Sequence, residues 1–158
     1  MAQLEAHLEG FKTASLEGAL PGADVVMTVT GRHHAVRRHH FDLMKDGVLL
    51  CNAGQNQFEM NIESLYEEAD KVRAIRPNVE ELTLPSGGKY FLLARGNPIN
   101  LAGGDGNPIE IMDLGLALQT LSLEFIANRS DALVQGLQTV PWEIEQATIK
   151  AALQEWVG

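Results

Sequence analysis

The chain has 158 residues, a formal net charge of −9 at pH 7, one cysteine, and a single basic patch at Arg32–His40. This length is typical of one domain that folds without a disulfide or a metal, and the acidic balance argues against nucleic acid because phosphates would be repelled. No apolar run approaches the roughly 20 residues of a membrane-spanning helix, and the lone Cys51 excludes an intrachain disulfide. We therefore expect one cytoplasmic domain over residues 1–158 that binds neither nucleic acid nor a membrane.

The first thirty residues predict short helices that alternate with strands. Ala2–Gly10 has apolar residues at helical spacing and ends at a glycine, Lys12–Ser15 predicts a short strand, and Leu16–Leu20 predicts one helical turn. Ala23–Gly31 reads ADVVMTVTG, and such a valine-rich run without polar alternation is typical of a strand covered on both faces. This alternation favours a mostly parallel sheet.

A second buried strand is predicted at Gly47–Gly54, after a helical turn at His40–Met44. Ile62–Ala69 predicts an amphipathic helix with Asn61 as its N-cap. From Lys71 onward, β-prone runs alternate with glycine and proline turns, which predicts a β-hairpin added to the sheet.

Two helices are predicted in the last third of the chain. Pro108–Asn128 is the longer, with Asn107 as N-cap and Pro108 in the first helical position. Its apolar residues occupy nearly every face, which predicts burial on several sides or in an oligomer interface. Trp142–Val157 predicts the last helix. The expected fold class is α/β: a three-layer domain with a mostly parallel sheet, an added β-hairpin and C-terminal helices.

Three segments follow one another in an order that is specific to one family: GVLLCNAGQNQFEMNIESL, RGNPINLAGGDGNP and PIEIMDLGLALQTLSLEFIANR. On these motifs the chain resembles S-adenosyl-L-homocysteine hydrolase (adenosylhomocysteinase) over roughly its whole length. The similarity is to the C-terminal part of that family's NAD-binding domain. It implies a partial Rossmann-like fold, NAD as cofactor, and the reversible NAD-dependent hydrolysis of S-adenosylhomocysteine to adenosine and homocysteine.

The resemblance also implies which residues meet the cofactor. The turns Thr28–Gly31 and Asn52–Gln55 match positions along the dinucleotide, whereas Asn100 and Asn107 match positions near the nicotinamide or the adenosine. The cofactor-binding candidates are Thr28, Thr30, Gly31, Asn52, Ala53, Gly54, Gln55, Asn100 and Asn107. No catalytic residue is assigned. From the residues alone a structural role is favoured, because threonines are typical of strand ends and glycines of simple turns; the resemblance favours contact with the cofactor instead.

The sequence departs from the family pattern at several points. The first βαβ unit with its glycine-rich phosphate-binding turn is absent, and so is the substrate domain, so we expect no hydrolysis by this chain alone. The histidine of the family's CNIGH motif is Gln55 here, and that of its GHP motif is Asn107. Neither replacement titrates near neutral pH, which indicates a divergent member.

The two histidine pairs in Arg32–His40 are the only cluster in the sequence that suggests a metal site. Pairs six residues apart fit no common zinc spacing, and the two arginines between them would repel a cation, so we interpret the segment as a solvated face without a metal. Cys51, inside a predicted strand, is interpreted as a buried, inert thiol.

Two functional hypotheses follow. In the first, the chain is the NAD-binding portion of a hydrolase-like enzyme, and its ligand is a nucleotide or nucleoside. A homo-oligomer, or a partner chain that supplies the missing N-terminal half, would complete it. In the alternative, it is a divergent, non-catalytic nucleotide-binding or oligomerisation module.

Overall fold

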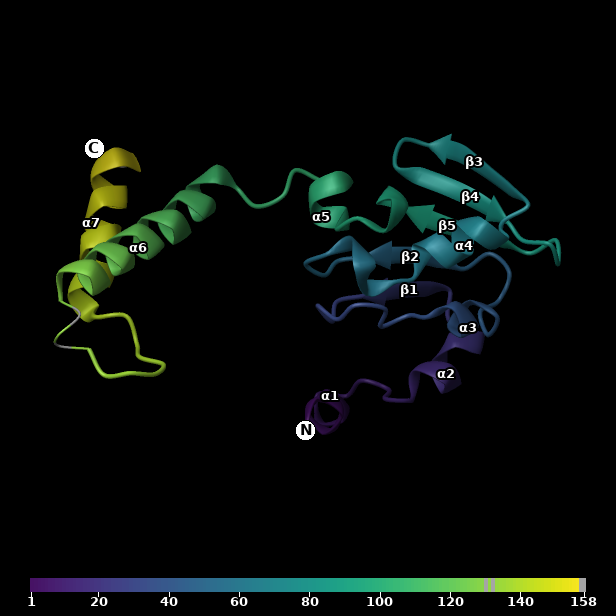
Figure 1. Ribbon diagram of the computed structural model, residues 1–158, viewed down its shortest axis with the longest axis horizontal. Coiled ribbons are helices and arrows are strands. Elements are labelled where there is room, and N and C mark those ends of the chain that lie inside the picture. The colour runs from purple at the N-terminus through teal and green to yellow at the C-terminus, as the bar shows by residue number, and fades with distance from the viewer. Residues whose placement is uncertain (130, 132, 157–158) are drawn as a thin grey trace. The chain divides into compact units, whose positions relative to one another are not determined.

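The computed structural model describes residues 1–129, 131 and 133–156 (Figure 1). They fall into two compact units, Met1–Asp105 and Gly106–Gly158, and each is considered by itself. The first unit contains α1 (Ala2–Leu8), α2 (Leu16–Ala19), η1 (Leu20–Gly22), β1 (Val25–Thr28), α3 (Arg38–Phe41), β2 (Leu49–Asn52), η2 (Gln57–Glu59), α4 (Ile62–Glu68), β3 (Lys71–Arg76), β4 (Val79–Thr83), β5 (Lys89–Leu93), η3 (Ala94–Gly96) and α5 (Ile99–Ala102). The second contains α6 (Ile109–Asn128) and α7 (Trp142–Trp156). The single domain expected from the length stays a prediction.

One five-stranded sheet organises the first unit, in the order β1-β2-β5-β4-β3. β1, β2 and β5 run parallel, and β4 and β3 continue the sheet in antiparallel pairs. Figure 1 shows this order, with α4 in front of the sheet. The predicted α/β class with its added hairpin is confirmed.

The core lies around the middle strands and the inner face of α4. Leu50, Leu65, Leu82 and Leu92 have no exposed side-chain surface, and they come from β2, α4, β4 and β5. Burial of apolar surface of this kind is the main favourable contribution to folding. The helix α4 begins as predicted, because the Asn61 side chain accepts the backbone N–H of its N3 residue at 3.3 Å.

The strand β1 departs from the prediction of cover on both faces. Val26 and Thr28 are buried, whereas Val25 and Met27 are 53% and 51% exposed. The reason is that β1 is an edge strand that pairs only with β2 in the part of the chain described. The strand predicted at Lys12–Ser15 is wrong too: no ladder forms there, and the Ser15 hydroxyl instead caps α2 through the Gly18 N–H at 3.2 Å.

The helix α6 begins one residue later than expected. Pro108, not Asn107, is the N-cap, since its extended backbone (φ −53°, ψ 141°) precedes the first helical residue. The Asn107 amide instead donates to Met112 Sδ at 3.7 Å. The predicted capping role of Asn107 is therefore wrong, and its ligand role stays a prediction.

No residue of α6 is buried in the second unit, although α6 packs against α7 (Figure 1). Ile109, Leu116 and Leu123 are 79%, 55% and 68% exposed. The expected burial on several sides is therefore wrong for the described residues, and an oligomer interface stays a prediction. Among those residues, no helix is long and apolar enough to cross a membrane.

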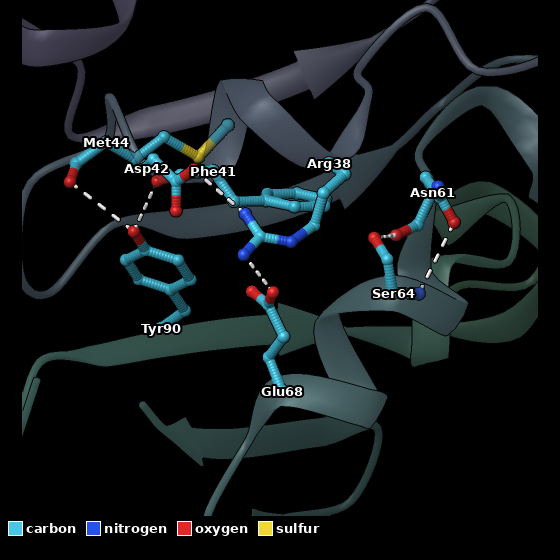
Figure 2. A network of polar contacts seen from close by, with 8 residues as sticks. All are labelled: Arg38, Phe41, Asp42, Met44, Asn61, Ser64, Glu68 and Tyr90. Atoms are coloured by element: carbon cyan, nitrogen blue, oxygen red, sulfur yellow. Dashed lines mark hydrogen bonds and ion pairs between the residues drawn. The ribbon is translucent and has the colours of Figure 1, made fainter. Parts of the chain in front are cut away.

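Polar contacts join α3 to the sheet and to α4 (Figure 2). The Tyr90 hydroxyl donates to the Phe41 carbonyl at 2.6 Å and lies 3.4 Å from the Met44 carbonyl, and all three residues are buried. Burial, followed by nearby carboxylates, raises the pKa of Tyr90, so it remains a donor at neutral pH. Arg38 also forms an ion pair with Glu68 of α4.

We expect Tyr90→Phe to lower the free energy of unfolding by about 1–3 kcal/mol, because it leaves a buried carbonyl without its donor. Urea unfolding checks this, with an unchanged dependence on urea concentration as evidence that the fold persists. A stability equal to that of the wild type would mean that water replaces the hydroxyl.

Candidate functional site

The ends of two parallel strands bring the predicted turns together. In the register of β1 and β2, Thr28 lies opposite Asn52, so the segments Thr28–Gly31 and Asn52–Gln55 leave the sheet at the same edge. An isolated parallel bridge between Asn52 and Pro98 adds a third segment there. The carboxyl edge of a parallel sheet is where ligands bind in open α/β folds.

The Asn52 side chain joins these three segments. Its Oδ1 accepts the Thr28 hydroxyl at 3.3 Å and the Gly54 N–H at 2.7 Å. Its Nδ2 donates to the carbonyls of Asn56 at 2.6 Å and Gly96 at 3.0 Å. Both oxygen lone pairs and both N–H groups are therefore used inside the protein. The side chain holds the edge together, and contact with a cofactor stays a prediction for this residue.

A buried carboxylate, Glu59, fastens the turn after β1. Its Oε2 accepts the Thr30 N–H at 2.7 Å and the Thr30 hydroxyl at 2.8 Å, and its Oε1 accepts the Gly31 N–H at 2.8 Å. The side chain has no exposed surface. The Thr30 hydroxyl also accepts the Arg32 N–H at 3.1 Å.

Glu59 was not among the residues predicted from the sequence, and its local pattern is not distinctive. It is the only charged residue between Gly54 and Ile62, in a segment that follows a buried strand and precedes a helix. Lone acidic residues are most often exposed, so the pattern does not distinguish this one. Burial alone would raise the pKa of Glu59, but the hydrogen bonds from Thr30 and Gly31 outweigh burial and hold it below its ordinary value.

The remaining predicted residues differ in their exposure to solvent. Ala53 is half-buried and donates its N–H to the Thr28 carbonyl at 2.9 Å. Gln55 is exposed after β2, and Asn100 is exposed in α5, two residues beyond the bridge at Pro98. Asn107 belongs to the second unit. The first unit thus brings together every candidate except Asn107.

A pocket of about 610 Å³ opens beside the end of β1. Thr28 and Thr30 line it, together with Arg32, Arg37 and the histidines of the same segment. This volume is within the usual range of small-molecule pockets. Two guanidinium groups favour an anionic ligand, and the Glu17 carboxylate in the same lining partly offsets their charge.

The predicted solvated face is wrong for His40, which is only 6% exposed. Glu17, His39 and His40 offer ligand atoms that all lie within 4.8 Å of one another. However, His40 Nδ1 accepts the Arg37 N–H at 3.0 Å, which places the proton of the neutral ring on Nε2, 3.5 Å from Glu17 Oε1. A metal ligand needs a bare Nε2, so this arrangement favours a polar contact between α2 and α3.

Acid should destabilise the chain through Glu59. Since the folded pKa is lowered, the ionised group stabilises the fold fully above its unfolded value of about 4.3, and this contribution is lost as the pH falls through the folded value. We expect the urea unfolding free energy to drop more steeply below about pH 4.3 in the wild type than in Glu59→Gln. Glu63→Gln, at an exposed glutamate of α4, is the matched control and should keep the wild-type profile. Identical profiles for the wild type and Glu59→Gln would contradict the assignment.

Comparisons with known proteins give the family of this chain. The family model described as S-adenosyl-L-homocysteine hydrolase, NAD binding domain, matches residues 1–106. The adenosylhomocysteinase of Nostoc sp. (strain PCC 7120 / SAG 25.82 / UTEX 2576) is 36% identical over 151 residues, which is 96% of this chain and 36% of that protein. Those of Aquifex aeolicus (strain VF5) and Pyrococcus abyssi (strain GE5 / Orsay) are 39% and 38% identical, over 95% and 96% of this chain and 36% of each relative.

The chain therefore spans about a third of the length of the curated relatives that it matches. The family model covers more than half of the 158 residues, and it ends one residue beyond the first compact unit. The mixed sheet with its parallel strands is consistent with a Rossmann-like domain. The chain belongs to the S-adenosyl-L-homocysteine hydrolase family through its NAD-binding domain, whose cofactor is NAD.

Proposed function

We propose that this chain is the NAD-binding portion of an S-adenosyl-L-homocysteine hydrolase-like protein, and that NAD lies along the turns after β1 and β2. The observation that carries the proposal is the meeting of Thr28–Gly31 and Asn52–Gln55 at one sheet edge, within a unit that matches the family's NAD-binding domain. Thr28 and Asn52, which are 24 positions apart in the sequence, are hydrogen-bonded there.

The residues at this edge fit a dinucleotide in polarity and in space. The pocket of about 610 Å³ is lined by Thr28 and Thr30, and Arg32 and Arg37 supply positive charge suited to a pyrophosphate. Gly31 adopts φ +66° with open space where a Cβ would stand, so backbone is accessible at that turn. Asn100 and Gln55 are exposed near the same edge and can donate or accept hydrogen bonds.

In the family reaction, bound NAD supplies a transient oxidation of the ribose hydroxyl of the nucleoside substrate. The part proposed for this chain is to bind and orient the cofactor. Gln55 and Asn107 cannot exchange protons near neutral pH, so they contribute hydrogen bonds only. We assign the described residues no proton transfer and no other catalytic step of the hydrolysis.

Calorimetric titration with NAD tests the site, with Gly31→Ala compared with Gly87→Ala. The two glycines are matched, since both have positive φ (+66° and +84°) and open space for a Cβ, but only Gly31 lies at the proposed site. Each substitution should cost about 1–2 kcal/mol of stability through backbone strain. Only Gly31→Ala should weaken NAD binding, by about tenfold or more, which is about 1.4 kcal/mol.

Equal affinities in the two variants would place NAD elsewhere. The absence of heat at about 1 mM NAD, repeated at a second temperature because the enthalpy can vanish at one temperature, would contradict NAD binding by this chain alone.

A second candidate role, assembly, rests on the exposed apolar side chains of α6. Ile109, Met112, Leu116, Leu123 and Ile126 are all at least 44% exposed. Two packed helices cannot cover apolar residues that surround one of them, and exposed patches of this kind mark interaction sites. We propose that α6 is covered in a homo-oligomer or by a partner chain.

Light scattering at micromolar concentration should therefore detect an oligomer of the purified chain. Leu116→Glu combined with Leu123→Glu should shift it towards monomer, because the new charges would be buried in the interface. Leu8→Glu is the control, since this leucine is 76% exposed but lies in α1. A monodisperse wild-type monomer would contradict self-assembly and leave a partner chain as the remaining form of the proposal.

A further inference from the structure

The fully buried carboxylate of Glu59 is the strongest polar feature that the proposed function does not use. Burying a charge is costly unless hydrogen bonds compensate for the lost water. Here three donors do so, the Thr30 N–H, the Thr30 hydroxyl and the Gly31 N–H, all at 2.7–2.8 Å. These donors come from one turn, so the carboxylate fixes the conformation of that turn.

The same contacts determine what the turn can offer a ligand. Successive backbone N–H groups often form anion-binding sites, as in phosphate-binding loops. At Thr30 and Gly31 both N–H groups already point to a carboxylate of the protein itself. An ionised Glu59 behind them would repel a phosphate. The turn can therefore contribute its shape and its carbonyl groups, but not an anion-binding pair of amides.

Gly54 is required by Glu59. An ideal Cβ at position 54 would lie 1.6 Å from Glu59 Oε1 and 2.5 Å from Glu59 Cδ, distances at which the carboxylate has to move. Gly31 differs, because its surroundings are open and its backbone has φ +66°. The two positions therefore favour glycine for different reasons. At position 54 the Glu59 side chain occupies the space of a Cβ, whereas at position 31 the backbone is left-handed.

We propose that Glu59 is a positioning residue that holds the turn after β1 in its ligand-binding shape, and that Gly54 is a glycine to leave room for this carboxylate. The link to the cofactor rests on the proposed function, whereas the link between Gly54, Glu59 and the turn does not. Glu59 acts through Thr30 and Gly31 and has no contact with the ligand itself.

A double-mutant cycle on the full chain tests the contact between Gly54 and Glu59. Gly54→Ala should displace the carboxylate and accelerate amide hydrogen exchange at Thr30 and Gly31 by about tenfold or more, the effect of losing one hydrogen bond. In a Glu59→Ala background the same substitution should add little, because the obstructing group is gone. Gly22→Ala is the control: open space surrounds its Cβ position and its φ is not positive. Additive effects of the two substitutions would overturn the proposal.

The Glu59→Gln variant distinguishes a local role of Glu59 at the turn after β1 from a general contribution to the stability of the fold. Glutamine has nearly the same shape, but its NH₂ group cannot accept a hydrogen bond. It therefore loses the hydrogen bonds that one of the two carboxylate oxygens accepted. We expect faster exchange at Thr30 and Gly31 alone, unchanged exchange in β4 and β5, and about a tenfold rise in the Kd for NAD. Glu63→Gln, exposed on α4, should change none of these.

The wild type supplies a further test that does not depend on any variant folding. If the carboxylate accepts both N–H groups, the amide proton shifts of Thr30 and Gly31 should titrate together with the Glu59 carboxyl carbon. Independent titration, or unchanged exchange in Glu59→Gln, would overturn the proposal.

If the wild type does not bind NAD, the proposed function fails, and the exchange and cycle measurements still decide the role of Glu59. If NAD binds equally to wild type and Glu59→Gln, the positioning role fails while the cofactor site stands.

Discussion

The arrangement of the sheet edge depends on one buried carboxylate. Glu59 follows β2 in the chain, but its hydrogen-bond donors follow β1, so it joins segments that the sheet alone brings only near each other. Because an ionised group without solvent is stable only when its hydrogen bonds are made, these contacts hold the turn in one conformation. Asn52 does the same with a neutral amide that uses all its hydrogen-bonding atoms. The edge is therefore set before any ligand arrives.

This internal network separates two kinds of residue that lie at the same edge. Asn52 and Glu59 are buried and satisfied by protein atoms, so they give the edge its shape. Arg32, Gln55 and Asn100 are exposed and can meet a ligand. Preorganisation of this kind lowers the entropic cost of binding, since the binding groups are already ordered. It also explains how a chain can match an NAD-binding family while its most buried polar residues face protein.

The boundary between the two compact units lies close to the end of the family model. The first unit ends at Asp105, and the family's NAD-binding model ends at residue 106. The end of this unit and the end of the family model therefore differ by one residue, and the sheet with its core lies before both. The helices α6 and α7 lie beyond it, and α6 has apolar residues that a pair of helices cannot cover. The oligomer or partner chain proposed above would cover these residues.

The sequence by itself determined the features that depend on local pattern. The strands β1 and β2, the turns after them and the Asn61 cap were predicted, because strand propensity, turn chemistry and capping are set by neighbouring residues. Only the tertiary structure decided which residues those turns would meet. A charged residue such as Glu59 is normally exposed, and its burial follows from donors 28 and 29 positions away in the chain. The exposure of one face of β1 was likewise decided by its place at the sheet edge, which is a matter of strand order and leaves no periodic trace in the sequence.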